Sequence, residues 1–143
     1  MQSLPRLALV ALATLAALAL LAGCGKKAWP EPAAIEDSFS FVRPQSRLSS
    51  GCLMIDTPVA GAWRNLRAVH LELAWDDCQG CPFRPVEIRE FVPGDAFSTL
   101  IEGRLALTAC GLDPAKAYRW RLTGKSIHKT LRDVRTEVMT TTP

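Results

Sequence analysis

From Ser38 onward, this sequence predicts an all-β fold, a seven-stranded antiparallel β-sandwich. Apolar and polar residues alternate with a period of two in short segments, as in strands with one buried face. No stretch of this region sustains the period of about 3.6 residues that marks an amphipathic helix. Turn-prone sequences such as Val92-Pro93-Gly94-Asp95 separate the segments. Short alternating strands joined by turns are typical of two antiparallel sheets packed face to face.

Seven segments carry the alternation and are expected to form the strands. They cover residues 38–42, 51–57, 66–75, 85–91, 104–109, 118–122 and 134–140. The segment 66–75 is the clearest, because apolar residues recur there at every second position from Val69. The residues expected to share one face of their segment are Phe39 and Phe41; Leu53 and Ile55; Val69, Leu71, Leu73 and Trp75; Val86 and Ile88; Leu105 and Leu107; Tyr118, Trp120 and Leu122; and Val134 and Val138. Those expected to point outward are His70, Glu72, Arg119 and Arg121.

Residues 1–23 precede the predicted sandwich and are interpreted as a helical export signal. Arg6 is their only charged residue, and residues 7–22 are almost wholly Leu, Ala and Val. Such a run is short for a membrane-spanning helix and typical of the apolar core of a signal peptide. It ends in Leu21-Ala22-Gly23-Cys24, which resembles the lipobox of bacterial lipoproteins. An ordinary secretory signal followed by a coincidental cysteine is the alternative.

The lipobox resemblance implies a lipid anchor on Cys24. Signal peptidase II would cut before Cys24, whose sulfur would carry diacylglycerol and whose new amino group would carry a further acyl chain such as palmitate. Three acyl chains make a stable anchor, since each buried CH₂ contributes about 0.8 kcal/mol. Gly25, not Asp, follows Cys24. By resemblance to lipoprotein sorting in enteric bacteria, this implies the outer membrane, with the domain facing the periplasm. No other cofactor is expected.

Residues 24–37 are expected to form a tether between the lipid and the sandwich. Lys26 and Lys27 lie next to the anchor, where each would favour anionic headgroups by about 1 kcal/mol at most. Trp29-Pro30-Glu31-Pro32 is expected to be stiff and extended, because proline fixes φ and restricts the preceding residue. Trp29 is expected either in the membrane interface or packed on the domain.

The stretch Gly111-Leu112-Asp113-Pro114-Ala115-Lys116-Ala117-Tyr118 resembles the link between strands E and F of fibronectin type III domains, whose pattern is G-L-x-P-x-x-x-Y. The closing residues 138–143 also resemble the end of such a domain. The resemblance implies a fibronectin type III or immunoglobulin-like sandwich over residues 38–143. It also implies a tyrosine corner, in which the Tyr118 hydroxyl bonds to the backbone a few residues upstream.

With this resemblance, the seven segments become strands A, B, C, C′, E, F and G. The segment 51–57 is then strand B, and the segment 66–75 is strand C. A rival register makes 66–75 strand B, because Trp75 matches the Trp that the family carries on that strand. The two registers place Cys52 on different strands, so the cysteines help to choose between them.

Four cysteines remain in the predicted domain: Cys52, Cys78, Cys81 and Cys110. An even number in an exported domain favours disulfides. In the first register Cys52 begins strand B and Cys110 ends strand E, which are antiparallel neighbours in this fold. A bridge between them would contribute on the order of 4 kcal/mol in the chain-entropy model. In the rival register Cys52 lies on the far edge strand, too far from Cys110 for a bond.

Cys78-Gln79-Gly80-Cys81 lies in the loop between strands C and C′ and is expected to form a structural disulfide. Three alternatives stay open: a redox-active pair of the thioredoxin type, a four-cysteine zinc site, and mixed pairing among the four cysteines. Pro82 and the absence of a βαβ pattern argue against the redox pair, and the spacing lacks the second close pair of a zinc site. No metal is therefore expected.

The remaining composition argues against an enzyme and against nucleic-acid binding. The chain from Cys24 to Pro143 has 120 residues, and removal of Arg6 leaves 16 basic and 14 acidic residues, a net charge of +2. This balance and export both disfavour a nucleic-acid partner. His70 and His128 are the only histidines, and both are expected to be surface residues. No Ser–His–acid set and no phosphate-binding glycine pattern stands out.

The expected fold brings two loops together at the end opposite the cysteines, on the side of the N-terminus. These B–C and F–G loops would gather an exposed tryptophan and six basic or histidine side chains: Trp63, Arg64, Arg67, Lys125, His128, Lys129 and Arg132. Such a surface suits a phosphate or carboxylate group of an envelope partner. The alternative is a set of solvated loop charges with Trp63 packed against the core.

These observations predict a lipid-anchored binding or structural module of the cell envelope, with an envelope protein or an anionic envelope component as partner. Small sandwiches of this type usually lack a deep pocket, which favours a macromolecule over a small ligand. The alternative function is a thiol-disulfide or metal-handling lipoprotein that uses Cys78 and Cys81. Reactive free thiols at these two positions in the folded protein would favour the alternative.

Overall fold

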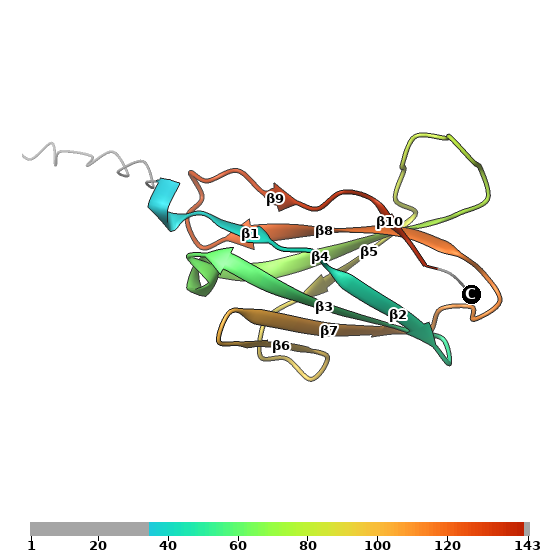
Figure 1. Ribbon diagram of the computed structural model, residues 1–143, viewed down its shortest axis with the longest axis horizontal. Helices are drawn as coiled ribbons and strands as arrows, with labels where there is room; N and C mark the ends of the chain where they lie inside the picture. The colour runs from blue at the N-terminus through green and yellow to red at the C-terminus, as the bar shows by residue number, and fades with distance from the viewer. Residues whose placement is uncertain (1–34, 142–143) are drawn as a thin grey trace, which may run out of the picture. The chain divides into compact units, whose positions relative to one another are not determined.

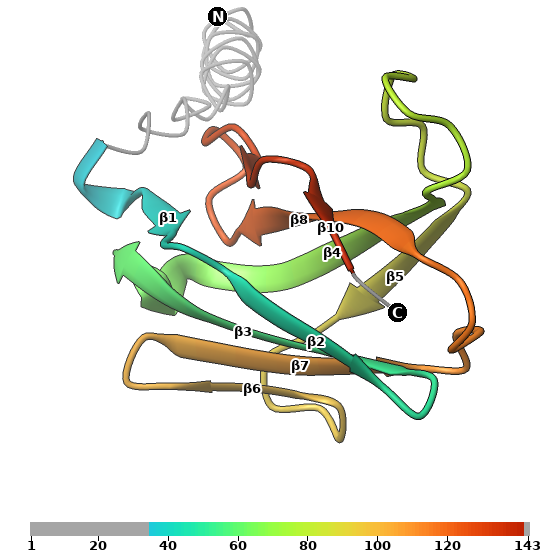
Figure 2. The same ribbon diagram turned by 45° about the vertical axis from the view of Figure 1, so that its right-hand side comes forward.

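Residues 35–141 fold into two antiparallel β-sheets that lie one over the other (Figures 1 and 2). The computed structural model describes these residues; the expected export signal, Cys24 and most of the tether lie outside them. Every strand pairing among the described residues is antiparallel. The predicted all-β fold with two packed antiparallel sheets is therefore confirmed.

The first sheet has the strand order β1-β3-β7-β6, and β2 also pairs with β3. Its strands are β1 (Phe39–Phe41), β2 (Gln45–Ser49), β3 (Cys52–Gly61), β6 (Ser98–Ile101) and β7 (Arg104–Cys110). A short 3₁₀ turn, η1 (Ile35–Asp37), precedes β1, and a second one, η2 (Trp63–Asn65), links β3 to the other sheet. β3, which covers most of the predicted segment 51–57, lies between the β1/β2 pair and β7.

The second sheet has the order β10-β8-β4-β5, and β9 also pairs with β8. Its strands are β4 (Leu66–Trp75), β5 (Glu87–Phe91), β8 (Tyr118–Ser126), β9 (Val134–Arg135) and β10 (Met139–Thr140). The long strands β4 and β8 pair from Leu66 and Ser126 at one end to Trp75 and Tyr118 at the other. They form the centre of the sheet, and β5 is one of its edges.

The described residues contain ten strand segments, three more than the seven predicted. Each predicted segment contains a strand. The additional strands β2 and β6 were missed because β2 is a largely polar edge strand and β6 has only four residues. The last predicted segment is interrupted at Thr136, whose amide bonds to the Leu122 carbonyl while its hydroxyl accepts from the Leu122 amide. It therefore forms β9 and β10.

Many of the residues that the alternation predicted lie in the core between the sheets. Its fully buried members include Leu53, Ile55, Leu71, Leu105 and Trp120. They come from β3 and β7 of the first sheet and from β4 and β8 of the second, so both inner faces contribute. Burial at every second position of β3 and β7 follows the pleat of a half-buried strand.

Three predicted faces are wrong. The Trp75 side chain is 52% exposed, because the turn that carries Lys116, and not a strand of the first sheet, lies next to its ring. Val86 and Ile88 share a face, as predicted, but that face is exposed, and Phe91 in the opposite phase joins the core. Val138 is exposed because it lies in the gap between β9 and β10.

The hydrogen bond of the tyrosine corner that the resemblance implied is present. The Asp113 amide donates to the Tyr118 hydroxyl oxygen at 2.9 Å, and the Tyr118 ring is buried. The Tyr118 amide donates to the Thr141 hydroxyl at 2.9 Å, and the Thr141 amide donates to the Tyr118 carbonyl at 2.8 Å. These bonds connect the start of β8 to the preceding turn and to the last described residue.

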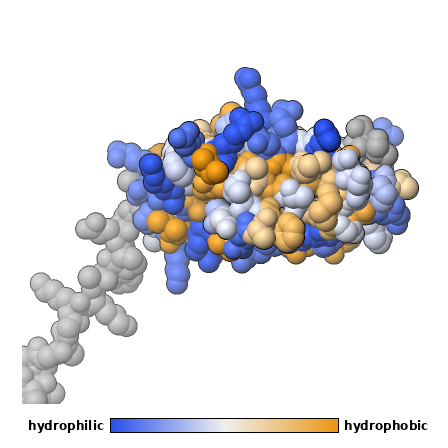
Figure 3. Space-filling view, turned by 90° about the horizontal axis from the view of Figure 1, so that it is seen from below, coloured by the Kyte–Doolittle hydropathy of each residue, from blue (hydrophilic) through white to orange (hydrophobic). Residues whose placement is uncertain are grey.

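One side of the sandwich is closed by β1, which lies against β8 and β9. Gly124 makes this approach possible: a Cβ atom there would lie 2.7 Å from Cε2 of Phe39 and 2.9 Å from Cζ of Phe41. The outside of the domain is mixed in character. On the face drawn in Figure 3, apolar side chains lie between polar and charged ones, as on most surfaces exposed to water.

Candidate functional site

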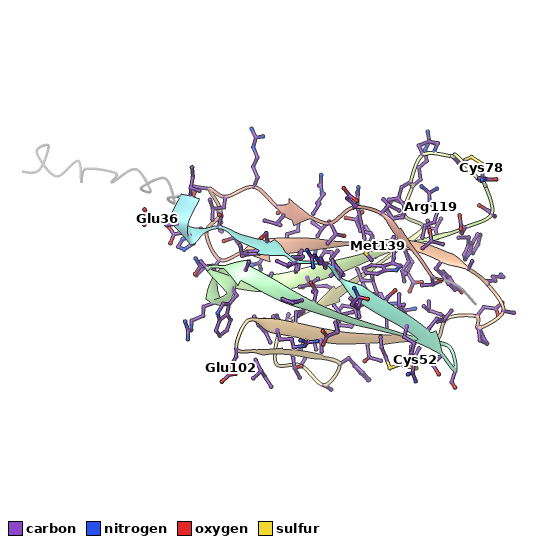
Figure 4. The ribbon with its side chains drawn as sticks, in the orientation of Figure 1. Glu36, Cys52, Cys78, Glu102, Arg119 and Met139 are labelled. Atoms are coloured by element: carbon purple, nitrogen blue, oxygen red, sulfur yellow. A yellow bond between two sulfur atoms is a disulfide. The ribbon has the colours of Figure 1, made fainter. Side chains whose placement is uncertain are left out.

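The cysteines form two disulfides, Cys52–Cys110 and Cys78–Cys81. Cys52 on β3 lies directly opposite Cys110 on β7 in the strand register, and the bond joins residues 58 positions apart. The predicted bond between Cys52 and Cys110 is therefore present, and the two strands that carry these residues are neighbours, as expected. Cys78 and Cys81 are bonded to each other, as a structural pair is expected to be. Figure 4 shows Cys52 and Cys78 toward the same end of the domain, which we call the distal end.

The Cys78–Cys81 pair lies in the exposed loop 76–86 between β4 and β5, and no helix follows it among the described residues. A thioredoxin-type site places this motif at the start of a helix, which lowers the pKa of the attacking thiol. That feature is missing here. No group of three or more His, Cys, Asp or Glu side chains in residues 35–141 is placed to hold a metal ion. The thiol-disulfide or metal-handling role stays an untested prediction.

The opposite, proximal end is formed by the β3–β4 loop (residues 62–65) and the β8–β9 loop (residues 127–133). The Ile127 amide donates to the Asn65 carbonyl at 2.9 Å, so the two loops meet as predicted. The side chain of Asn65 also donates to the Asp37 carbonyl at 2.9 Å. The described chain therefore starts at this end, away from the cysteines (Figures 1 and 4).

Trp63 does not stand free in this basic region. Its side chain is half-buried and packs against the core, next to Gly103 in the β6–β7 turn. The Arg64 guanidinium lies 4.4 Å from the centre of the Trp63 ring. Of the two expectations for Trp63, the packing of its ring against the core is therefore the one that the structure supports, because η2 places the ring beside the β6–β7 turn.

The predicted basic residues of the proximal end differ in their surroundings. The Lys125 ammonium pairs with the Asp133 carboxylate, and His128 is half-buried with its amide bonded to the Ser126 hydroxyl. Of the predicted basic residues, Arg64, Arg67, Lys129 and Arg132 are exposed, and none of these four forms an ion pair with a described residue. The proximal end is thus a basic surface of separate charges without an aromatic centre.

The distal end carries the largest exposed aromatic side chain of the described domain, Trp75. The Lys116 ammonium lies 5.2 Å from the centre of its ring, within the range of a cation–π contact. A hollow of about 270 Å³ is lined by Trp75, Asp76, Asp77, Lys116 and Ala117. A second hollow of about 220 Å³ also includes Trp75, and its other lining residues are Ala74, Asp77, Cys78, Cys81, Pro82, Arg84, Val86 and Arg119.

The loop 76–86 is held against the outer face of β8. The Arg119 guanidinium donates to the Cys81 carbonyl at 2.8 Å (Figure 4). The Phe83 ring lies over two guanidiniums, with its centre 5.7 Å from Arg119 and 5.1 Å from Arg121. Trp75 is thus flanked by a loop that is fixed by a disulfide, a hydrogen bond and two cation–π contacts. Sequence reasoning missed this site because it grouped Trp75 with Val69, Leu71 and Leu73 on the apolar face of one strand.

Below this loop lies a buried acid, Glu72, which was expected to point into solvent. It does occupy the outer face of β4, but it is only 7% exposed. The Arg121 guanidinium bonds to its carboxylate at 2.7 and 2.8 Å, and the Thr123 hydroxyl donates at 2.7 Å. Burial alone would raise the pKa of Glu72, but the bonds from Thr123 and Arg121 and the charges of Arg121 and Arg135 lower it below its usual value.

Replacing Glu72 with Gln is expected to lower the free energy of unfolding by about 2 kcal/mol at pH 7, because Arg121 loses its partner. The folded-state pKa of Glu72 is depressed, so this stabilisation is present above the unfolded pKa of about 4.3 and is lost as the pH falls through the folded value. Urea unfolding at several pH values measures it. Glu90→Gln, at an exposed carboxylate beside His70, is the control. If the difference in free energy of unfolding between Glu72→Gln and the unsubstituted chain did not become smaller at acidic pH, the depressed pKa of Glu72 would be contradicted.

No protein-family model matches the chain, and neither a curated protein nor a solved structure shows significant similarity to it. Within residues 35–141, none of the helices is long and apolar enough to cross a membrane.

Proposed function

We propose that this chain is a lipid-anchored lipoprotein of the cell envelope that binds another envelope macromolecule through its distal end. The observation that carries the proposal is the exposed Trp75 between two hollows, beside a loop closed by a disulfide. Exposed tryptophans flanked by depressions are frequent centres of binding energy in protein interfaces. A loop that is already fixed loses little conformational entropy when a partner binds.

The size of the hollows favours a macromolecular partner. They measure about 270 and 220 Å³. Small-molecule sites usually enclose roughly 300–1,000 Å³ and bury most of the ligand. Each hollow therefore suits one side chain or one ring of a larger partner. The two hollows are lined by charges of both signs, which are available to that partner: Asp76, Asp77 and Lys116 in the first, and Asp77, Arg84 and Arg119 in the second.

The anchor rests on the lipobox resemblance, with diacylglycerol and an N-acyl chain on Cys24 and the outer membrane as the location. The described chain starts at Ile35, at the end opposite the loop 76–86 (Figure 1). The ten residues 25–34 reach at most about 36 Å when fully extended. A tether that joins the domain at the proximal end leaves the distal end free for a partner.

We also propose that the sandwich belongs to the fibronectin type III or immunoglobulin-like class. The β1/β2 pair would be strand A, β3 strand B, β4 strand C, β5 strand C′, β7 strand E, β8 strand F and the β9/β10 pair strand G. The neighbours of each strand and the hydrogen bond to the Tyr118 hydroxyl support this assignment. In that description β6 is an additional edge strand beside E.

Trp75→Ala is expected to lower affinity for the partner by about 2 kcal/mol or more, as the loss of a central aromatic does. The test is affinity capture from crosslinked envelopes with the full chain as bait. The matched variant is Lys129→Glu with Arg132→Glu, which reverses the exposed charge of the proximal end and should leave capture unchanged. Loss of capture only in the charge-reversed variant would move the binding surface to the proximal end. Unchanged capture in both would contradict a binding role for either end.

A further inference from the structure

The second sheet ends in an edge strand whose exposed face carries two apolar side chains, Val86 and Ile88, followed by Glu90, which pairs with His70. β5 pairs with β4 on one side and with no other strand in the described part of the chain. Ile88 at its second position is 58% exposed, and Val86 just before it is 63% exposed. On the opposite side of the sandwich, β1 and β9 contact each other and so cover their edges. Free edges with apolar side chains are the places where a further strand can pair.

Two of the three charged residues of β5 flank Ile88, while the third, Glu90, pairs with His70. Glu87 precedes Ile88, Arg89 follows it, and their side chains form an ion pair at 2.6 Å. The Arg89 guanidinium also donates to the Cys110 carbonyl. Suppose that β5 of a second copy pairs antiparallel with β5 of the first, with a two-fold axis at Ile88. Glu87 of each copy then faces Arg89 of the other. Opposite charges in directly facing positions stabilise a strand pair. Ile88 then faces Ile88 of the second copy and loses its exposure to water.

Other registers do not share this property. Residues that face each other in an antiparallel pair point to the same face of the joined sheet. A two-fold axis between two residues would place an inward side chain opposite an outward one, so the axis must pass through a residue. An axis at Glu87 or at Arg89 brings like charges together, and an axis at Val86 or Glu90 pairs no opposite charges. The charge pattern thus selects one antiparallel register, centred on Ile88. Self-complementarity of this kind is what a two-fold symmetric interface requires.

We propose that two copies of this chain associate through their β5 strands, with the two-fold axis at Ile88. The two second sheets join into one continuous sheet, in which β5 of one copy lies beside β5 of the other. The partner is a second copy, and not a strand of another protein, because the Glu87–Arg89 pattern is complementary to itself. This proposal does not rest on the proposed binding by Trp75, although Val86 also lines the second hollow beside that ring.

The first test places a cysteine on the axis. Ile88→Cys is made in the full chain, oxidised in its membrane environment, and examined without reductant. Ile101→Cys is the matched control, since Ile101 is 66% exposed on β6, the edge strand of the first sheet, which has no charged residue. Disulfide-linked dimer in Ile88→Cys and not in Ile101→Cys is expected. Equal crosslinking of both variants, none in either, or a link from position 88 to another protein would overturn the proposal.

The second test uses charge. Glu87→Arg brings arginines together at two places in each dimer, so we expect the dissociation constant to rise about tenfold or more, measured by light scattering of the full chain in detergent. Adding Arg89→Glu exchanges the charges and should restore the dimer. A chain that is monomeric at every concentration before any substitution overturns the proposal. So does a double variant that folds, by circular dichroism, yet stays as weakly associated as Glu87→Arg.

Discussion

Removing the Cys52–Cys110 disulfide by replacing both residues with Ala is expected to lower the free energy of unfolding by about 4 kcal/mol. The bond closes a loop of 58 residues, and a long loop gains many conformations in the unfolded chain when the bond is absent. Cys52 is half-buried and Cys110 is exposed, so the loss of side-chain packing is small. Chemical unfolding with a spectroscopic readout measures the difference.

The second disulfide provides the control for this prediction. Cys78 and Cys81 are three positions apart, so their bond restricts only a short loop and is expected to contribute about 2 kcal/mol at most. The variant with Ala at both of these positions should therefore keep most of its stability. Equal losses in the two double variants would show that loop closure does not explain how the Cys52–Cys110 bond stabilises the fold.

Replacing Trp120 with Ala is expected to lower the free energy of unfolding by about 4 kcal/mol. Trp120 is 0% exposed and lies in β8 between Leu73 on β4 and Met139 on β10 in the strand register. Truncation removes the largest fully buried side chain of the described domain and leaves a cavity between the sheets. Because domains of this size are stable by only about 5–15 kcal/mol, the variant should unfold at much lower denaturant concentration.

Trp120→Phe separates packing from polarity at the same position. The indole Nε1 has no hydrogen-bond partner among the described residues, so replacement by Phe removes a buried N–H that makes no bond. The ring volume is partly kept. We therefore expect a loss well below that of Trp120→Ala, measured by the same unfolding experiment. Equal losses in the two variants would indicate that Nε1 makes a bond that the protein atoms do not reveal.

The strands and their core faces were predictable because alternation is a local property. In β3 and β7, Leu53, Ile55, Leu105 and Leu107 repeat every second position, and each is buried. The pairing of Cys52 with Cys110 was expected from the strand order that the fibronectin type III resemblance implies. The strands that were missed lack this pattern: β2 is mostly polar, and β6 is too short to show a period.

The faces that were wrong depend on contacts distant in sequence. Trp75 has the phase of Leu71 and Leu73, but burial also requires a strand opposite it, and there the turn with Lys116 follows instead. Glu72 has the phase of an outward residue, yet Arg121 and Thr123 of β8 enclose it. The same limit explains why the predicted site was centred on Trp63, which is packed, while Trp75 at the other end is exposed. Local spacing does not report where a sheet ends.

Central to the proposed function is export with lipidation of Cys24, and the intact mass of the protein extracted from membranes tests it most directly. The predicted species begins at Cys24, carries diacylglycerol and one further acyl chain, and gains about 4 Da on reduction as two disulfides open. The Cys24→Ala variant should lack these lipids and should therefore be released from the membrane fraction. A membrane-extracted chain that still begins at Met1, with Cys24 unmodified, would contradict the account.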